Sequence, residues 1–114
     1  MGEGKSEVLQ GTLDLMVLKT LDVMGLLHGY GIGQRLEQIS GETLQINPGT
    51  IYLCLMRLQQ QKFISSRWGV SENNRKAKFY GITAAGRKRL AAETAQWDLV
   101  AGVMGRILQQ KAQS

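Results

Sequence analysis

Apolar residues in the first part of the chain recur every three or four positions, the spacing of helices that pack against a core. In the first such stretch they are Leu13, Met16, Val17, Leu21 and Met24. This pattern predicts a buried helix over residues 12–25, with Thr12 as its N-cap and Gly25 as its stop. A glycine-rich turn at residues 28–31 and a second helix over about residues 30–40 are expected to follow.

A third helix is predicted to begin after Asn47, because asparagine is a favourable N-cap and Pro48 is tolerated in the first turn. Its expected core stripe is Ile51, Leu55 and Leu58. At about 100° per residue, the opposite face carries Gly49, Leu53, Met56 and Gln60. The flanks of that face are Thr50 and Arg57 on one side and Tyr52 and Gln59 on the other. Two apolar side chains on an outward face are unusual for a surface that meets only solvent.

The next segment is typical of two antiparallel strands, predicted over residues 63–70 and 77–83. Between them, residues 71–76 supply the polar side chains and asparagines that favour a turn. Thr83 is then the expected N-cap of a long last helix over about residues 84–110.

The last helix carries an apolar stripe with coiled-coil spacing, interrupted at its first d position by Glu93. The a positions are Leu90, Trp97 and Met104, and the d positions are Val100 and Ile107. No further compact body remains in the sequence for this stripe to cover. It therefore predicts contact with a second copy of the chain. Folding back onto the first helix is the alternative, and the two arrangements are compatible.

A helix followed by a basic hairpin is the layout of a winged helix. The predicted fold class is thus mainly α with a small β-hairpin, a winged helix-turn-helix followed by a long C-terminal helix. The expected division is a DNA-binding part over residues 1–83 and a dimerisation helix over residues 84–114.

Composition narrows the class of protein further. A chain of 114 residues with 43% hydrophobic residues is typical of one small globular protein. The most apolar stretch, residues 13–27, contains three charged residues, which argues against a membrane span of roughly 20 apolar residues. The polar N-terminus is unlike a signal peptide, and a single cysteine forms no internal disulfide. These features favour a cytoplasmic protein.

The net charge of +5 is unevenly distributed. Residues 1–61 carry four basic and six acidic side chains, whereas residues 62–114 carry ten basic and three acidic ones. Seven of those ten lie in the hairpin and the start of the last helix: Arg67, Arg75, Lys76, Lys78, Arg87, Lys88 and Arg89. Clustered positive charge indicates a polyanion partner, although a solvated basic face is the simpler alternative.

Residues for catalysis or metal binding are scarce. His28 is the only histidine and Cys54 the only cysteine, with no evident third group to orient such a pair. Zinc needs about four ligands, and phosphate-binding glycine loops are absent from the sequence. We therefore predict neither an enzyme nor a cofactor, and expect a core cysteine and a turn histidine.

Three blocks of residues resemble the PadR family of bacterial transcriptional regulators. The first runs from Gly11-Thr12-Leu13-Asp14-Leu15 to His28-Gly29-Tyr30-Gly31-Ile32. The second is Gly49-Thr50-Ile51-Tyr52 with Leu55 and Leu58, and the third is Phe79-Tyr80-Gly81-Ile82-Thr83-Ala84-Ala85-Gly86. Their order and spacing are specific, and the single C-terminal helix is similar to that of the smaller family members.

The resemblance implies a homodimer that represses transcription and leaves its operator when a small aromatic or apolar effector binds. Where the family commonly has Pro, Ala, Leu and His after the tyrosine, this chain has Leu53, Cys54, Leu55 and Met56. Loss of a polar residue at Met56 removes a base or phosphate contact, but a thymine methyl can pack on Leu53 or Met56. Arg57 is expected to bind a phosphate or a guanine.

Two sets of candidate site residues follow. The residues expected to bind double-stranded DNA are Asn47, Thr50, Tyr52, Leu53, Met56, Arg57, Asn73, Asn74, Arg75, Lys76 and Lys78. The resemblance also implies that Trp97 stacks on a flat effector between subunits, with packing in the dimer as its alternative role. The other residues expected to line that cavity are Val100, Met104, Leu13 and Met16. Trp68 is expected to pack the hairpin onto the helices.

The sequence thus predicts a dimeric DNA-binding repressor with an inverted-repeat operator. A second hypothesis is a dimerising protein–protein adapter on a winged-helix scaffold that does not bind DNA, since exposed apolar groups such as Leu53 and Met56 often mark protein contacts. A third, a small enzyme, would need an activity that depends on Cys54 or His28.

Overall fold

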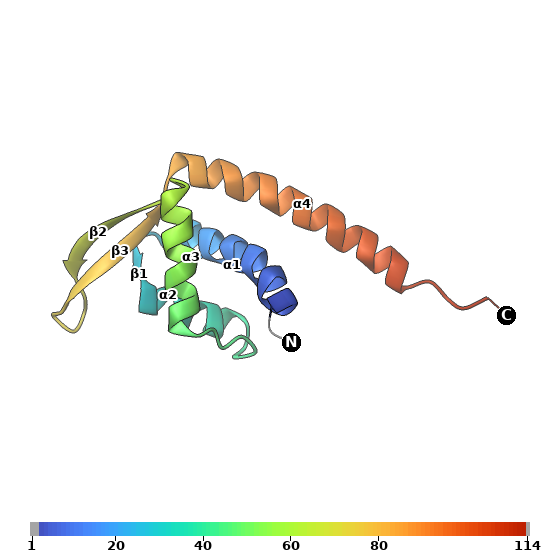
Figure 1. Ribbon diagram of the computed structural model, residues 1–114, viewed down its shortest axis with the longest axis horizontal. Helices are drawn as coiled ribbons and strands as arrows, with labels where there is room; N and C mark the ends of the chain where they lie inside the picture. The colour runs from blue at the N-terminus through green and yellow to red at the C-terminus, as the bar shows by residue number, and fades with distance from the viewer. Residues whose placement is uncertain (1–2, 114) are drawn as a thin grey trace.

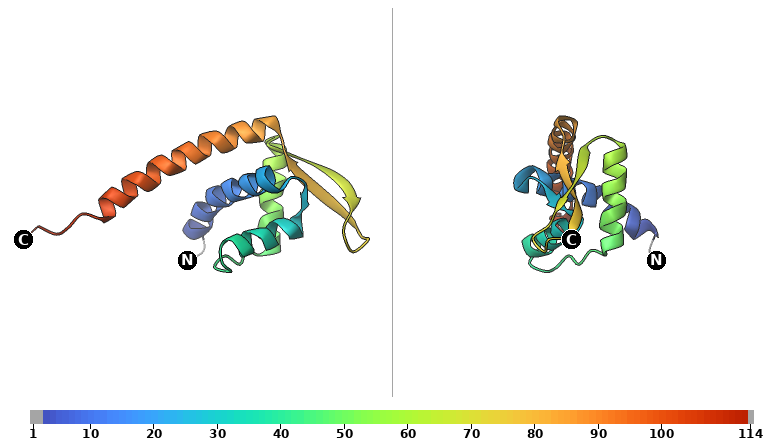
Figure 2. Two further views of the ribbon diagram at one scale, coloured as in Figure 1. Left: turned by 180° about the vertical axis from the view of Figure 1, so that it is seen from behind. Right: turned by 90° about the vertical axis from the view of Figure 1, so that its left-hand side faces the viewer.

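The computed structural model describes the backbone of residues 3–113 and the side chains of residues 11–113. Within these residues the chain forms four helices and three strands (Figure 1). They are α1 (Glu3–Met24), β1 (Leu27–His28), α2 (Gly29–Ile39), α3 (Pro48–Gln60), β2 (Ile64–Val70), β3 (Lys76–Ile82) and α4 (Ala84–Leu108). The first three helices and the sheet form a head. From it α4 extends to one side and the β2–β3 hairpin to the other (Figure 2).

A single apolar core holds the head together. Its members are Leu13, Val17, Leu18, Leu21, Ile32, Leu36, Ile51, Cys54, Leu55, Leu58, Ile64, Tyr80 and Leu90. They come from all four helices and from both strands of the hairpin. The predicted core stripe of α3 is confirmed. Leu90 is the contribution of α4, so the beginning of that helix is packed into the head.

The first helix is longer than its sequence pattern indicated. It begins at Glu3, so the prediction that Thr12 caps its N-terminus is wrong. The preceding residues include Glu, Lys, Leu and Gln, which all favour helix and extend it beyond the apolar stripe. The predicted stop is confirmed: Gly25 has φ +80°, a left-handed conformation that glycine adopts without steric strain.

The expected turn at residues 28–31 instead contains a short strand and a helix start. In β1, Leu27 pairs with Tyr80 and His28 with Phe79 of β3. His28 then caps α2, because its Nδ1 accepts a hydrogen bond of 3.0 Å from the amide of Gly31. No sequence pattern indicated this strand, since two residues are too few to show alternation. The second helix itself is confirmed within one residue.

Local signals placed α3 and the hairpin correctly. Asn47 Oδ1 accepts a hydrogen bond of 2.7 Å from the amide of Gly49, and Pro48 is the first helical residue. The three strands are antiparallel in the order β1-β3-β2. In the hairpin, Trp68 lies opposite Lys78 and Val70 opposite Lys76. The hairpin is the wing of the winged helix, and it stands beside α3 (Figure 2).

Thr83 joins the hairpin to α4, as predicted. Its Oγ1 accepts a hydrogen bond of 3.0 Å from the amide of Gly86 and donates one of 2.8 Å to the carbonyl of Lys62. Arg87 Nε lies 3.3 Å from Asp22 Oδ1, which ties the start of α4 to α1. The first turns of α4 therefore pack on α1, while the rest of the helix extends beyond the head (Figure 1).

Candidate nucleic-acid interface

The outer face of α3 is uncovered, as its helical spacing predicted. Tyr52, Leu53 and Met56 are 57%, 61% and 42% exposed, and no other described element of the chain covers them. Asn47 and Thr50 at the N-terminal end of the same helix are also exposed. A helix that is buried on one side and presents a mixed polar and apolar face on the other has the form of a recognition helix.

Arg57 differs from its expected position on that face. Its guanidinium binds the carboxylate of Asp14 on α1, with Nη2 on Oδ1 and Nε 3.4 Å from Oδ2. This hydrogen bond to Asp14 raises the pKa of Arg57. Both side chains are about three-quarters buried. The pair joins α1 to α3, so Arg57 has a structural partner, and its contact with DNA stays a prediction.

Cys54 binds the same carboxylate from the adjacent turn of α3. Its Sγ donates a hydrogen bond of 3.0 Å to Asp14 Oδ1, and the side chain is 1% exposed. Burial raises the pKa of Cys54, and the hydrogen bond to Asp14 raises it further. A thiol that is buried and held in its neutral form is a poor nucleophile. The prediction of a core cysteine is confirmed.

Cys54 is expected to make the protein less stable at alkaline pH. The ordinary pKa of a thiol is about 8.5, and folding raises it. Above about pH 8.5 the unfolded state therefore binds fewer protons than the folded state, and the free energy of unfolding falls by at most about 1.4 kcal/mol per pH unit. Urea unfolding between about pH 7.5 and 9.5 measures the fall. Cys54→Ala is the control, and an equal fall in that variant would contradict the assignment.

The sheet that carries the wing lies beside α3, because β2 follows α3 in the chain and packs against it (Figure 2). Tyr80 of β3 is buried at the base of the wing, and burial raises its pKa. Electrostatic repulsion from Tyr52 raises the pKa of Tyr80 further.

The tip of the wing is polar and basic. Asn73, Asn74, Arg75 and Lys76 are exposed, and Lys78 is half-buried. Asn74 has φ +57°, a left-handed conformation that asparagine adopts more readily than most residues. The turn is closed by a hydrogen bond of 2.8 Å from the amide of Ser71 to the carbonyl of Arg75. This geometry presents the predicted cations of the wing to solvent.

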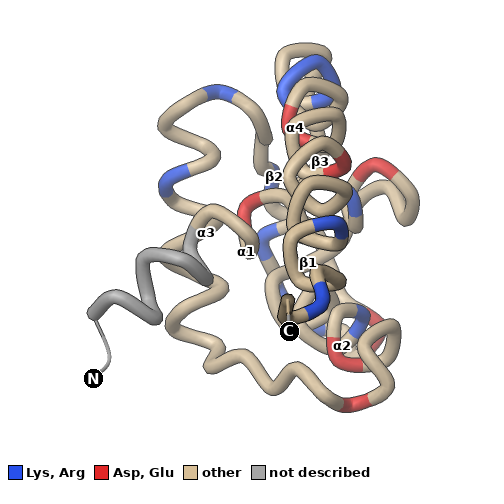
Figure 3. The backbone as a smooth tube through the Cα atoms, turned by 90° about the vertical axis from the view of Figure 1, so that its right-hand side faces the viewer, with Lys and Arg blue, Asp and Glu red and all other residues tan. Residues whose placement is uncertain are grey.

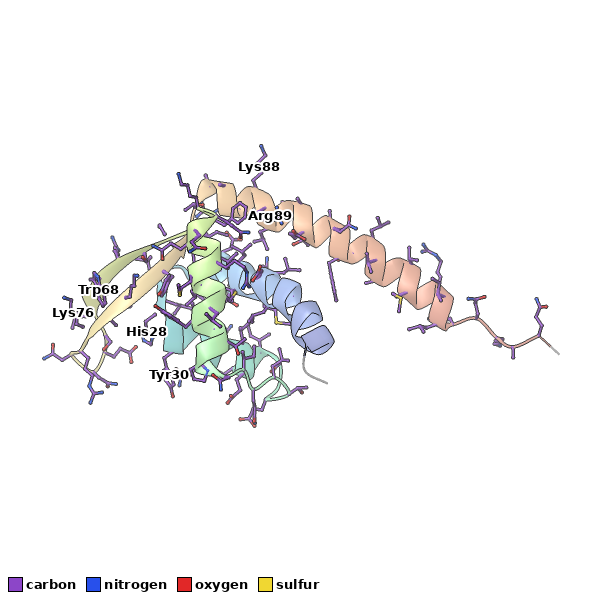
Figure 4. All side chains as sticks on the ribbon, viewed as in Figure 1. His28, Tyr30, Trp68, Lys76, Lys88 and Arg89 are labelled. Carbon is purple, nitrogen blue, oxygen red and sulfur yellow. The ribbon has the colours of Figure 1, made fainter. Side chains whose placement is uncertain are left out.

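Trp68 lies differently from its prediction. It is 62% exposed and lies on the part of the hairpin beyond the helices, so it does not pack the hairpin onto the head. Its neighbours are the ammonium groups of Lys76 and Lys78, whose Nζ atoms lie 5.0 and 6.0 Å from the ring centroid (Figure 4). The wing extends beyond the helical body (Figure 1), which agrees with the exposure of the ring.

The basic run at the start of α4 is partly neutralised. Figure 3, which looks toward the free end of α4, shows these residues in blue at the top of the helix, with acidic residues following in red. Arg87 binds Asp22, and Arg89 Nε lies 2.8 Å from Glu93 Oε1 and stacks on Phe63. Among the described residues, Lys88 alone of the three has no carboxylate partner, and it points away from the head (Figure 4).

A groove of about 310 Å³ lies between α1 and α4. Of the residues predicted to bind an effector, Trp97 and Val100 line it. Leu13 is 5% exposed and belongs to the core of the head, Met16 packs against that core, and Met104 lies farther along α4. These three do not line the groove in this structure. Its other apolar lining residues are Leu15, Leu18, Leu58 and Phe63, and its charged ones are Asp14, Arg89 and Glu93.

Two features are absent from the part of the chain that the structure describes. No cluster of three or more His, Cys, Asp and Glu side chains there is placed to hold a metal ion. None of the helices in that part of the chain has the length and apolarity needed to cross a membrane.

The head, the wing and the long terminal helix together define a winged-helix protein. The family model for the "Transcriptional regulator PadR-like family" matches residues 17–92. The chain therefore belongs to the PadR-like family and is a transcriptional regulator, not an enzyme. The matched region covers the whole of α2, α3 and the wing, the elements that form the surface described above.

Solved structures of similar regulators share the whole arrangement. A transcriptional regulator from Clostridium thermocellum is 27% identical, with a TM-score of 0.80 over 91% of this chain and 97% of that chain. A PadR-like regulator from Bacillus cereus is 26% identical, with a TM-score of 0.78 over 92% and 99% of the two chains. PadR from Bacillus subtilis, solved in complex with operator DNA, is 25% identical, with a TM-score of 0.64 over 73% of this chain and 47% of that one.

Two features of this surface escaped the sequence analysis. Asp14 was noted only as a charge within an apolar stretch, although a lone carboxylate on the core side of a helix indicates a buried partner. The partner, Arg57, lies 43 positions away, and its identity needs the tertiary fold. The exposure of Trp68 was missed because an apolar residue in a strand is ordinarily assigned to the core.

Proposed function

We propose that this chain is a DNA-binding repressor that acts as a homodimer on an inverted-repeat operator. The observation that carries the proposal is the uncovered outer face of α3 with the exposed basic wing beside it (Figure 2). The Bacillus subtilis relative that was solved with operator DNA has the same fold, which supports the same partner for this chain. A protein with this partner is expected in the cytoplasm, where the DNA is.

Each head is proposed to place α3 in the major groove. Thr50 and Tyr52 offer hydroxyl groups to base edges or phosphates, and Leu53 and Met56 offer apolar contact to thymine methyl groups. The wing then lies on the flanking backbone, where Arg75, Lys76 and Lys78 neutralise phosphates. Asn47, Asn73 and Asn74 are placed at the ends of this surface as further hydrogen-bonding groups.

The free part of α4 is proposed to form the dimer. Trp97, Val100, Met104 and Ile107 are between 44% and 52% exposed, so the helix carries a long apolar stripe that the described residues leave partly uncovered. A second copy related by two-fold symmetry would bury that surface. The two recognition helices would then read half-sites about 34–36 Å apart, one turn of DNA, or a multiple of that distance.

The groove between α1 and α4 is the proposed place for an effector. Trp97 offers a flat aromatic face and Val100 an aliphatic wall, which fits a small aromatic or apolar molecule. Its position beside the proposed dimer helix suggests how such a molecule would act. A ligand that alters the packing of α4 would change the separation of the two heads and so weaken binding to the operator.

Fluorescence anisotropy of the purified protein tests the proposal. The probes are the duplex upstream of its own gene and duplexes selected by the protein from fragmented genomic DNA, each beside a scrambled duplex. We expect tighter binding to the selected duplex, with a slope of about −0.9 per phosphate contact in a plot of log affinity against log salt. Sedimentation velocity should show a dimer. Failure to prefer any duplex over its scrambled version would reject the regulator.

One observation favours a second candidate, an adapter that binds another protein through α3. Leu53 and Met56 expose apolar surface where the recognition helix would meet DNA. An adapter would not need the cations of the wing, so reversing their charge separates the two functions.

A further inference from the structure

The exposed Trp68 on the wing is the feature that the proposed function leaves unexplained. A tryptophan side chain is large and apolar, and most are largely buried. Here 62% of the residue is exposed, and its neighbour on the same strand face, Val70, is 66% exposed. Figure 4 shows the ring on the hairpin, well separated from the helices. Such a ring suggests a binding partner outside the chain.

The strand register places Trp68 on the face that continues toward α3. Residues two apart on a strand share a face, so Trp68 lies on the same side of β2 as the buried Ile64. Its cross-strand partner Lys78 is two positions from Tyr80, which is buried at the base of the wing. One strip of the hairpin thus leads from Tyr80 at its base to the exposed Trp68, and the hairpin stands beside α3 (Figure 2). A duplex in contact with α3 would meet this strip.

The chemistry around the ring fits the edge of a DNA groove. Lys76 and Lys78 hold their ammonium groups 5.0 and 6.0 Å from the ring centroid, close enough for cation–π attraction. The strip therefore presents a flat apolar indole ring next to two positive charges. The minor groove has the complementary pattern, with apolar deoxyribose walls between two rows of phosphates. A purely basic wing would match the phosphates but leave the sugars uncontacted.

We propose that Trp68 is a direct DNA contact, and that its ring packs on the sugar wall of the minor groove beside the half-site while Lys76 and Lys78 bind the adjacent phosphates. The proposal rests on the proposed function, because it requires that α3 occupies the neighbouring major groove. It assigns the wing an apolar component of binding in addition to its charge.

Salt dependence separates the apolar contact from the ionic ones. Trp68→Ala should weaken binding to the selected duplex by roughly tenfold at every salt concentration, because the loss of an aromatic contact releases no counterions. The slope against log salt should stay unchanged. In the matched variant Lys78→Ala, the slope should fall by about 0.9. Trp68→Phe keeps an aromatic ring at this position and should keep most of the affinity for the selected duplex. Circular dichroism and urea unfolding verify that each variant is folded.

Fluorescence gives a second, independent result. The chain has two tryptophans, so the DNA-dependent change that wild type shows and Trp68→Phe lacks belongs to Trp68. We expect that change on titration with the selected duplex. If wild type binds but Trp68→Ala binds equally well, the inference fails and the regulator stands. If affinity and slope fall together without a Trp68 signal, the ring only positions the lysines, and the proposal is again wrong. If wild type selects no duplex, both fail.

Discussion

Replacing Gly86 by alanine is expected to destabilise the head more than the same change at any other described glycine. A Cβ at this position would overlap the carbonyl oxygen of Phe63 and lie 2.7 Å from Ile82 Cγ1. The Thr83 amide donates a hydrogen bond of 3.0 Å to the same carbonyl and holds Phe63 in place, so the backbone has little room to shift. We expect a loss of about 3 kcal/mol, or a fall in melting temperature of more than about 10 °C. Urea and thermal unfolding followed by circular dichroism measure it.

Gly102→Ala is the matched control in the same helix. A Cβ there meets only Arg106 Nη1 at 3.8 Å, an ordinary contact. Because alanine favours helix over glycine by about 1 kcal/mol, this variant should be as stable as wild type or more so. Equal stability of Gly86→Ala and wild type would show that the junction between the wing and α4 is looser than its geometry indicates.

Reversing the three wing cations should abolish operator binding without unfolding the head. In the variant Arg75→Glu, Lys76→Glu, Lys78→Glu, three attractions to phosphate become repulsions. Affinity for the selected duplex should fall more than about 100-fold at physiological salt. These side chains are exposed or half-buried and make no ion pair with another described residue, so stability should change by less than about 1 kcal/mol. Anisotropy and urea unfolding measure the two effects.

The control for this variant reverses charge at the other end of the molecule. Arg106→Glu with Lys111→Glu alters two cations near the free end of α4, which lies opposite the wing (Figure 1). Most of the electrostatic contribution falls off within about 8 Å at physiological salt, so the operator affinity should change by less than about threefold. Retained operator binding by the wing variant would contradict the assignment of these three cations to phosphate contacts.

Sequence predicted the parts of this fold that local chemistry determines. The caps at Asn47 and Thr83 and the stop at Gly25 depend on a side chain or a φ angle within three residues, and each was found. The spacing of apolar residues predicted the buried face of α3 and left its outer face open. The strand β1 was not predictable in this way, because its pairing with β3 joins residues about 50 positions apart.

The candidate site was predicted less completely than the fold. Helical spacing placed Tyr52, Leu53 and Met56 on the outer surface, where the structure has them. The same spacing left Arg57 on the flank of that surface, and only packing against α1 turns it to Asp14. The exposure of Trp68 depends on how far the hairpin extends past the helices. That distance is set by the tertiary fold and cannot be predicted from the alternation of residues within a strand.

The two-residue strand β1 also has a consequence for how the nascent chain folds. Its partner in β3 and the buried Leu90 of α4 leave the ribosome long after α1, α2 and α3 do. At typical rates of synthesis the delay is on the order of several seconds. During that time the apolar faces of the first three helices lack their covering sheet. Helix α3 therefore acquires its final position late in synthesis, when α4 is already emerging.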